Sequence, residues 1–74
     1  MPSDIRLKED IAPVGESAAG FPLYTFRYRG QQGIYQGVMA QDVVKTRPDA
    51  VIVDKDGFYM VDYGKLGIEF QRIQ

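Results

Sequence analysis

The stretch Ser3-Asp4-Ile5-Arg6-Leu7-Lys8 places a hydroxyl and an amine five residues apart near the start of the chain. A lysine amine can act as the base for a serine nucleophile, so Ser3 and Lys8 are candidates for a Ser/Lys pair. In a straight strand the two residues would lie about 16 Å apart, and on a helix their side chains would point to different faces. The pair therefore requires a bend between Ser3 and Lys8, or a partner from another chain. The lysine must also be neutral, which requires burial or a nearby cation.

The same residues have a purely structural interpretation. Ser3 or Asp4 can accept hydrogen bonds from backbone N–H groups and cap a short helical turn, and Lys8 would then be a solvated surface charge. The weak alternation of apolar residues instead predicts a short strand over residues 5–8, with Ile5 and Leu7 pointing inward.

Ser3–Ile11 resembles the opening of the C-terminal intramolecular chaperone domain of phage tail fibres and tailspikes, the endosialidase-chaperone or S74 peptidase family. Two later parts of the chain resemble the same pattern in order and approximate spacing. These are Gly37–Val43 with Pro48–Val51, and Gly57–Tyr63 with Leu66. The resemblance covers most of the chain.

The resemblance implies an intramolecular chaperone that helps three fibre chains to fold and then cuts itself off. By position, Ser3 would be the nucleophile, Lys8 its activating partner and Pro2–Ser3 the scissile bond. Attack of the Ser3 hydroxyl on the Pro2 carbonyl would give an ester that water hydrolyses, so this serine endopeptidase would act once, on itself. The alternative is an oligomerisation or protein-binding module of the same fold that does not cleave.

The chain has 74 residues and no cysteine or histidine, which predicts one small domain over residues 1–74. A chain of this length buries only about 60% of its unfolded surface. Neither a disulfide nor a His/Cys zinc site can stabilise it, and we expect no cofactor. Oligomerisation remains as a common source of stability. The resemblance implies that the partners are copies of the chain itself, as a homotrimer, and the upstream fibre region of its own precursor.

The net charge is −1, with acidic and basic residues mixed along the chain. This pattern does not favour binding to nucleic acid, and no apolar run approaches the roughly 20 residues of a membrane span. No signal peptide is visible. These features predict a cytoplasmic location, and the resemblance implies that this is the host cytoplasm during fibre assembly, with possible later association with a virion or cell-surface fibre.

The first half of the chain predicts a β-hairpin. Leu23–Tyr28 is rich in β-forming residues and predicts a strand. Gly30–Gly33 predicts a turn, after which residues 34–36 pair back. The strand places Tyr24, Phe26 and Tyr28 on one face, for which packing is a better explanation than a ligand platform. Residues 12–21 contain breakers and predict mostly loop, with room for a helical turn over residues 16–19.

The second half predicts a short helix and a second hairpin. Residues 40–46 have a helical apolar spacing, which turns Gln41 and Asp42 outward into solvent. Residues 50–53 are apolar and β-branched, which predicts a buried strand. Residues 54–57 predict a plain hairpin turn rather than a calcium loop, because a downstream glutamate at EF-hand spacing is missing. Residues 58–61 then pair back.

The C-terminal segment is open to two interpretations. Asp62 can cap a helix whose apolar stripe is Tyr63, Leu66, Phe70 and Ile73. The alternation of Leu66, Ile68 and Phe70 instead suggests a strand, and glycines at 64 and 67 disfavour a helix. The resemblance favours the helix. The expected fold is α+β, with two β-hairpins, one short helix and a short C-terminal helix or strand.

Overall fold

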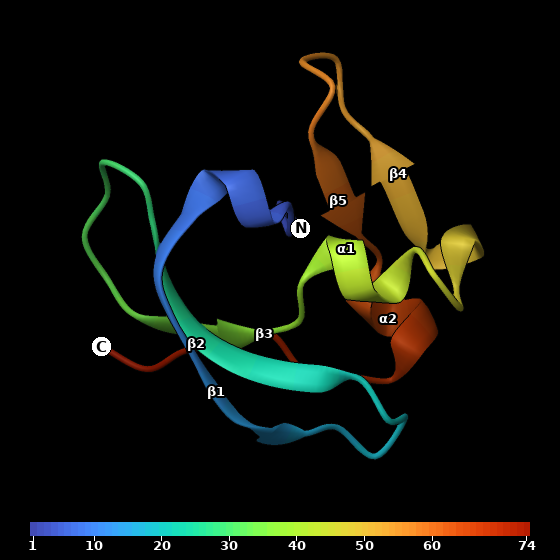
Figure 1. The fold of residues 1–74 in the computed structure, drawn as a ribbon, viewed down its shortest axis with the longest axis horizontal. Helices are drawn as coiled ribbons and strands as arrows, with labels where there is room; N and C mark the ends of the chain where they lie inside the picture. The colour runs from blue at the N-terminus through green and yellow to red at the C-terminus, as the bar shows by residue number, and fades with distance from the viewer.

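The structure, a computed structural model, describes residues 1–74 and confirms the α+β class (Figure 1). Strands β1 (Lys8–Glu16), β2 (Pro22–Tyr28), β3 (Tyr35–Gly37) and β6 (Gln71–Arg72) form one antiparallel sheet in the order β1-β2-β3-β6. Strands β4 (Val51–Val53) and β5 (Tyr59–Val61) form a second antiparallel sheet. The remaining elements are the helices α1 (Ala40–Val43) and α2 (Tyr63–Leu66) and the 3-10 turns η1 (Ile5–Leu7) and η2 (Pro48–Ala50). None of the helices has the length and apolar character that a membrane span requires.

Both predicted hairpins are confirmed. β2 pairs with β3 across a connection in which Gly30 and Gly33 have φ angles of 74° and 104°. β4 pairs with β5 across a turn in which Gly57 has a φ of 86°. Residues with a side chain rarely adopt these angles, so glycine is what allows the turns to close. The Asp54 carboxylate accepts hydrogen bonds from backbone N–H groups within the second turn.

The predicted loop over residues 12–21 is wrong for its first half, because β1 continues to Glu16 and only residues 17–21 form a turn. The predicted helical turn over residues 16–19 is likewise absent. β1 lies at the edge of its sheet, where Pro13 is tolerated although it lacks an N–H donor. The strand also shifts register on either side of Ala12 and Pro13, which accommodates the breakers as bulges.

The predicted strand over residues 5–8 is also wrong, because Ile5–Leu7 forms the 3-10 turn η1. Asp4 caps this turn by accepting a hydrogen bond from the Arg6 backbone N–H at 2.9 Å. Ile5 is exposed rather than inward. Of the alternatives open at the sequence level, the capped turn is the one that forms, and it bends the chain between Ser3 and Lys8.

The predicted helix over residues 40–46 is confirmed at its start but is shorter than expected, since α1 ends at Val43 and turns follow. The C-terminal segment combines both interpretations. Asp62 caps α2 by accepting a hydrogen bond from the Lys65 backbone N–H. Gly67 then ends the helix with a left-handed φ of 65°, and β6 pairs with β3.

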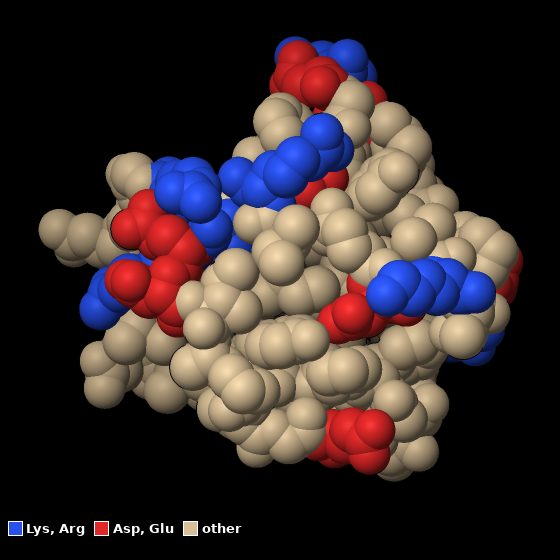
Figure 2. Space-filling view, viewed as in Figure 1, with Lys and Arg blue, Asp and Glu red and all other residues tan.

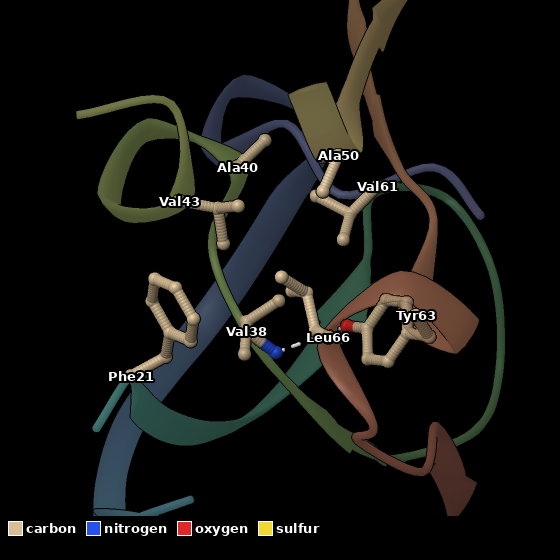
Figure 3. Packing of buried hydrophobic residues seen from close by; sticks show 8 residues of the cluster. All are labelled: Phe21, Val38, Ala40, Val43, Ala50, Val61, Tyr63 and Leu66. Carbon is tan, nitrogen blue, oxygen red and sulfur yellow. Dashed lines mark hydrogen bonds between the residues drawn. The ribbon is translucent and has the colours of Figure 1, made fainter. Parts of the chain in front are cut away.

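The hydrophobic core lies where α1, α2 and the base of the β4–β5 hairpin meet the four-stranded sheet (Figures 1 and 3). Its eight buried residues are Phe21, Val38, Ala40, Val43, Ala50, Val61, Tyr63 and Leu66. The Val38 backbone N–H donates to the Tyr63 hydroxyl at 3.0 Å, so the one polar atom of this cluster's side chains is satisfied (Figure 3).

β4 forms where residues 50–53 predict a strand, but the expected burial is wrong for its last two residues. Ile52 is 59% exposed and Val53 is 57% exposed. β4 pairs only with β5, and the hairpin extends away from the body of the domain (Figure 1). A continuous apolar run does not distinguish a strand inside a sheet from one in a projecting hairpin.

Candidate active site around Ser3 and Lys8

The residues before Ser3 run antiparallel to β5 like an additional strand. The Met1 ammonium donates to the Val61 carbonyl at 3.2 Å, and the Val61 N–H donates to the Met1 carbonyl at 2.9 Å. The Ser3 N–H donates to the Tyr59 carbonyl at 3.1 Å, and Pro2 forms a bridge with Met60. The Pro2–Ser3 peptide bond is therefore held in an extended conformation by backbone pairing.

Ser3 is fully buried. Its hydroxyl donates to the Met1 carbonyl at 3.0 Å. Its own carbonyl accepts a hydrogen bond from the Ala40 N–H, at the start of α1, at 2.8 Å. These contacts hold the serine between the β5 edge and α1.

Asp4 is a fully buried carboxylate that accepts five hydrogen bonds, two of them from backbone N–H groups. Arg6 binds it in a bidentate pair, with Nε–Oδ1 at 2.9 Å and Nη2–Oδ2 at 2.7 Å. The Gln41 amide donates to Oδ1 at 2.8 Å, and the Tyr59 backbone N–H donates to Oδ2 at 2.9 Å. The hydrogen bonds from Arg6, and then those from Tyr59 and Gln41, outweigh the effect of burial and hold the pKa of Asp4 far below its usual value. Asp4 therefore stays ionised and ties η1 to α1 and β5.

Lys8 is only 1% exposed, so its interpretation as a solvated surface charge is wrong. Its Nζ donates to the Val38 carbonyl at 2.9 Å and to the Ser3 carbonyl at 3.3 Å, and lies 3.6 Å from Met39 Sδ. The same nitrogen lies 4.0 Å from the centre of the Phe26 ring, within the range of a cation–π contact. None of the three ion pairs of the domain includes this lysine.

The surroundings of Lys8 favour loss of its proton. Burial lowers the pKa of the Lys8 amine to about 8, and the charge of Asp4 only partly opposes this effect. An amine with such a pKa is mostly neutral above about pH 8, whereas an ordinary lysine is still charged there. Burial thus shifts Lys8 towards the neutral form that a base for serine requires.

The structure brings Ser3 and Lys8 together but does not join them through the hydroxyl. Lys8 Nζ contacts the Ser3 carbonyl, whereas the Ser3 hydroxyl is directed to the carbonyl of Met1. Proton transfer from Ser3 to Lys8 therefore requires the serine hydroxyl to rotate away from Met1. Such rearrangement is common between a resting site and its reactive state.

The predicted outward orientation of Gln41 and Asp42 into solvent is wrong, because both side chains make specific contacts. Gln41 accepts a hydrogen bond from the Ile5 N–H at 2.9 Å while it donates to Asp4. Asp42 accepts a hydrogen bond from the Tyr24 hydroxyl at 2.9 Å. The sequence feature that could have assigned Gln41 to the site is its position in a stretch that carries the family resemblance.

Tyr28 is a second residue that sequence reasoning did not assign to the site. Its hydroxyl donates to the Pro2 carbonyl at 2.7 Å. The alternation of β2 places Tyr28 on the same face as Phe26, whose ring contacts Lys8, so the strand pattern contained the signal. The described side chains include no cluster arranged to bind a metal ion.

The three stretches that carry the resemblance meet at this site. The backbone and side chains of Gly37–Val43 contact Ser3, Asp4 and Lys8. The backbone of Gly57–Tyr63 contacts the N-terminal segment and Asp4. Segments far apart in the sequence therefore form a single cradle around the opening motif.

The chain matches the model of the family Peptidase_S74, described as the chaperone of endosialidase, over residues 3–52. Neither a curated protein nor a solved structure matches the chain at a significant level. The matched region includes Ser3, Lys8 and the whole α1 side of the cradle. The chain therefore belongs to the endosialidase-chaperone family, and this membership supports a chaperone role.

Proposed function

We propose that the domain assists trimeric assembly of a tail-fibre-like protein to which it is joined, and that it is released by cleavage of its own Pro2–Ser3 bond. The observation that carries this proposal is the position of Lys8. A buried amine without an ion pair lies against the serine that the family pattern marks as the nucleophile. Burial without an ion-pair partner destabilises the charged form of a lysine. Such a lysine is a frequent sign of a functional site.

In the proposed reaction the Ser3 hydroxyl oxygen bonds to the Pro2 carbonyl carbon, and its proton passes to neutral Lys8. The C–N bond then breaks, and the Ser3 nitrogen takes up a proton to become a free amine. The product of this first step is an ester between Pro2 and the Ser3 oxygen. Water adds to the ester carbonyl and the serine oxygen leaves with a proton, which gives a Pro2 carboxylate and an intact Ser3.

The arrangement of the site supports this reaction in two further ways. The scissile peptide is fixed along β5 by backbone hydrogen bonds, which positions the reacting groups before attack. The ionised Asp4 anchors the turn between Ser3 and Lys8 through partners on α1 and β5. We expect the cleavage to take place in the host cytoplasm during fibre assembly.

The proposed trimer finds support in the surface of the domain. Basic and acidic side chains are interspersed on the face shown in Figure 2, with a broad uncharged area between them. Exposed apolar side chains are Met1, Ile5, Val14, Ile52, Val53 and Ile73. A domain this small gains stability when such groups are buried between copies.

One observation favours the alternative, a chaperone-family assembly module that does not cleave. The Ser3 hydroxyl donates to the Met1 carbonyl rather than to Lys8. A hydroxyl satisfied in this way is part of a stable structure, and Lys8 would then serve only to bind the Val38 and Ser3 carbonyls.

Intact-mass spectrometry on a fusion protein distinguishes the two functions. A trimeric β-fibre segment is joined before Met1, so that the Pro2–Ser3 bond is retained, and is compared with the Ser3→Ala and Lys8→Ala variants. The proposal predicts a product that begins at Ser3 in the parent fusion and only full-length chains in both variants. Ser17→Ala and Lys55→Ala, which change a serine and a lysine outside the site, serve as matched controls and should cleave. Full-length product from a folded parent trimer would establish the non-cleaving module.

A further inference from the structure

The hydrogen bond between the Tyr28 hydroxyl and the Pro2 carbonyl has a consequence for the proposed reaction. The donor–acceptor distance is 2.7 Å, a normal length for a well-formed O–H···O hydrogen bond. The acceptor is the carbonyl oxygen of the scissile bond itself. When a nucleophile adds to this carbonyl carbon, the oxygen takes up the negative charge.

The phenol of Tyr28 is positioned at the end of β2 by contacts with neighbouring aromatic rings. Its ring packs edge-on against Phe26, with centroids 5.4 Å apart at 83°, and against Tyr35, with centroids 5.3 Å apart at 61°. Phe26 is almost fully buried and also contacts Lys8. One aromatic cluster therefore positions both the lysine and the tyrosine relative to the Pro2–Ser3 bond.

The environment also keeps the Tyr28 hydroxyl protonated. Burial, followed by the effect of Tyr63 and Tyr35, raises the pKa of Tyr28 above its usual value. Tyr28 is thus a hydrogen-bond donor throughout the pH range in which Lys8 loses its proton. The two residues have different roles available to them, one as donor and the other as base.

Solvent reaches the scissile bond from the side of Tyr28. A cavity of about 420 Å³ is lined by Met1, Pro2 and Tyr28 together with Leu7, Tyr35 and Phe70. Ser3 and Lys8 lie outside this lining and are buried. The cavity gives water a path to the Pro2 carbonyl, which the second step of the reaction requires.

We propose that Tyr28 is a third catalytic residue, whose hydroxyl stabilises the oxyanion that forms on the Pro2 carbonyl oxygen during self-cleavage. This inference rests on the proposed Ser3/Lys8 reaction. Tyr28 gives up no proton in either step; its O–H bond is retained while the hydrogen bond strengthens as charge develops on the acceptor. The same donor serves ester formation and ester hydrolysis, because both pass through a tetrahedral centre at the same carbon.

The test compares Tyr28→Phe with the parent in the fusion described above, by intact mass over time. Loss of one oxyanion donor lowers the rate by about 10² to 10³-fold in related acyl-transfer sites, and we expect a decrease of that size. Tyr24→Phe is the matched control. It removes a hydroxyl of the same strand that donates to Asp42 at 2.9 Å, away from the scissile bond, and should cleave like the parent.

The outcomes separate this inference from the proposed function. A parent fusion that never cleaves overturns both. A parent that cleaves, with a folded Tyr28→Phe variant within about threefold of its rate, overturns the role of Tyr28 alone. If Tyr28→Phe does not fold, fluorotyrosine at position 28 decides, because it keeps the ring and hydroxyl but donates more strongly. Cleavage a few-fold faster than the parent supports the role, and an unchanged rate overturns it.

Discussion

The site around Ser3 buries polar side chains, whereas the β4–β5 hairpin exposes apolar ones. Both regions depart from the usual distribution of side chains in a folded protein. At the site Ser3, Asp4 and Lys8 are polar or charged and are buried to within 1% exposure, yet no buried side-chain N or O atom lacks a hydrogen bond. In β4, Ile52 and Val53 are apolar and more than half exposed. Burial of polar groups and exposure of apolar groups both cost free energy, so each needs a reason.

The difference agrees with the two roles proposed for these regions. The site holds polar groups in one arrangement and shifts their pKa values, as a site for proton transfer would. The hairpin leaves apolar area available, which suits a surface that is covered in a larger assembly.

Replacement of Asp4 by alanine should give the largest loss of stability. The change removes the shared acceptor of Arg6, Gln41 and Tyr59 and leaves buried donors unpaired. We expect the free energy of unfolding to fall by about 3 kcal/mol, measured by urea denaturation.

Asp49→Ala is the matched control for this prediction. Asp49 also binds an arginine two residues away in a bidentate pair, with both N–O distances to Arg47 at 3.0 Å, but this pair is exposed. Exposed pairs contribute little, so Asp49→Ala should leave unfolding nearly unchanged. Equal losses of stability in the two variants would show that burial does not increase the contribution of Asp4.

Asp4 should also govern acid stability. Its pKa is lower in the folded chain than its usual value of 3.8. The stability that it contributes is therefore present above about pH 4 and is lost as the pH falls below it. Asp4→Asn should flatten this acid limb in denaturation curves measured from about pH 5 downward. An acid limb as steep as that of the parent would contradict the assignment.

Lys8 should give a second rise of stability with pH, in the alkaline range. Its pKa falls from 10.5 to about 8 on folding, so the unfolded chain binds a proton between these values that the native chain does not. The free energy of unfolding should therefore rise with pH across this window, by about 3 kcal/mol in total. The raised pKa of Tyr28 opposes this rise above about pH 10, so the slope is best measured between about pH 8 and pH 10.

Lys8→Met should flatten this alkaline rise, because methionine fills similar space without a titrating group. Lys55→Met, at the tip of the β4–β5 hairpin, is the control and should keep the slope of the parent. A parent curve without a rise, or a rise that survives in Lys8→Met, would mean that the buried amine titrates normally.

The core beside the site should be sensitive to a single methyl group at Gly37. A Cβ atom there would collide with the Tyr63 hydroxyl, which accepts the Val38 N–H hydrogen bond. We expect Gly37→Ala to destabilise the domain by about 2 kcal/mol. In a Tyr63→Phe background the same change should cost clearly less, because the clashing atom is gone. A double-mutant cycle measures this coupling, and strictly additive losses would contradict the contact.

The smallest effect on the folded monomer should come from the exposed strand. Replacing Ile52 and Val53 together by threonine keeps β propensity, and should change the free energy of unfolding of the monomer by no more than about 0.5 kcal/mol. If β4 is an assembly surface, the same double variant should shift the sedimentation profile from trimer towards monomer. Val14→Thr, on the edge strand β1 and similarly exposed at 51%, is the control. Unchanged assembly in the β4 variant would remove the hairpin from the trimer interface.

The hairpins and the start of α1 could be predicted from sequence because their signals are local. Glycines at the turns and β-forming residues in Leu23–Tyr28 act within a few residues of where they stand. The extent of β1 could not be predicted, because Pro13 and Gly15 usually break strands and are tolerated only at a bulged sheet edge. Edge position is a property of the whole sheet.

The identity of the candidate pair could be predicted from the opening motif, but its environment could not. Lys8 is buried by the Val38 carbonyl and the Phe26 ring, which lie 30 and 18 residues further along the chain. The capping of η1 by Asp4 outweighed the weak alternation of Ile5 and Leu7. Gln41 was expected in solvent because of its position on the helix. Its partner is a buried carboxylate that another segment contributes. The errors at Lys8 and Gln41 have the same origin, a contact that joins segments distant in sequence.

The pH dependence of self-cleavage in the fusion protein tests most directly whether the buried lysine is a working base. The account predicts a rate that rises with pH and levels off above about pH 8, where the Lys8 amine becomes neutral, and no cleavage in Lys8→Ala at any pH. A rate that stays constant across this range, or cleavage before Ser3 that persists without Lys8, would contradict it.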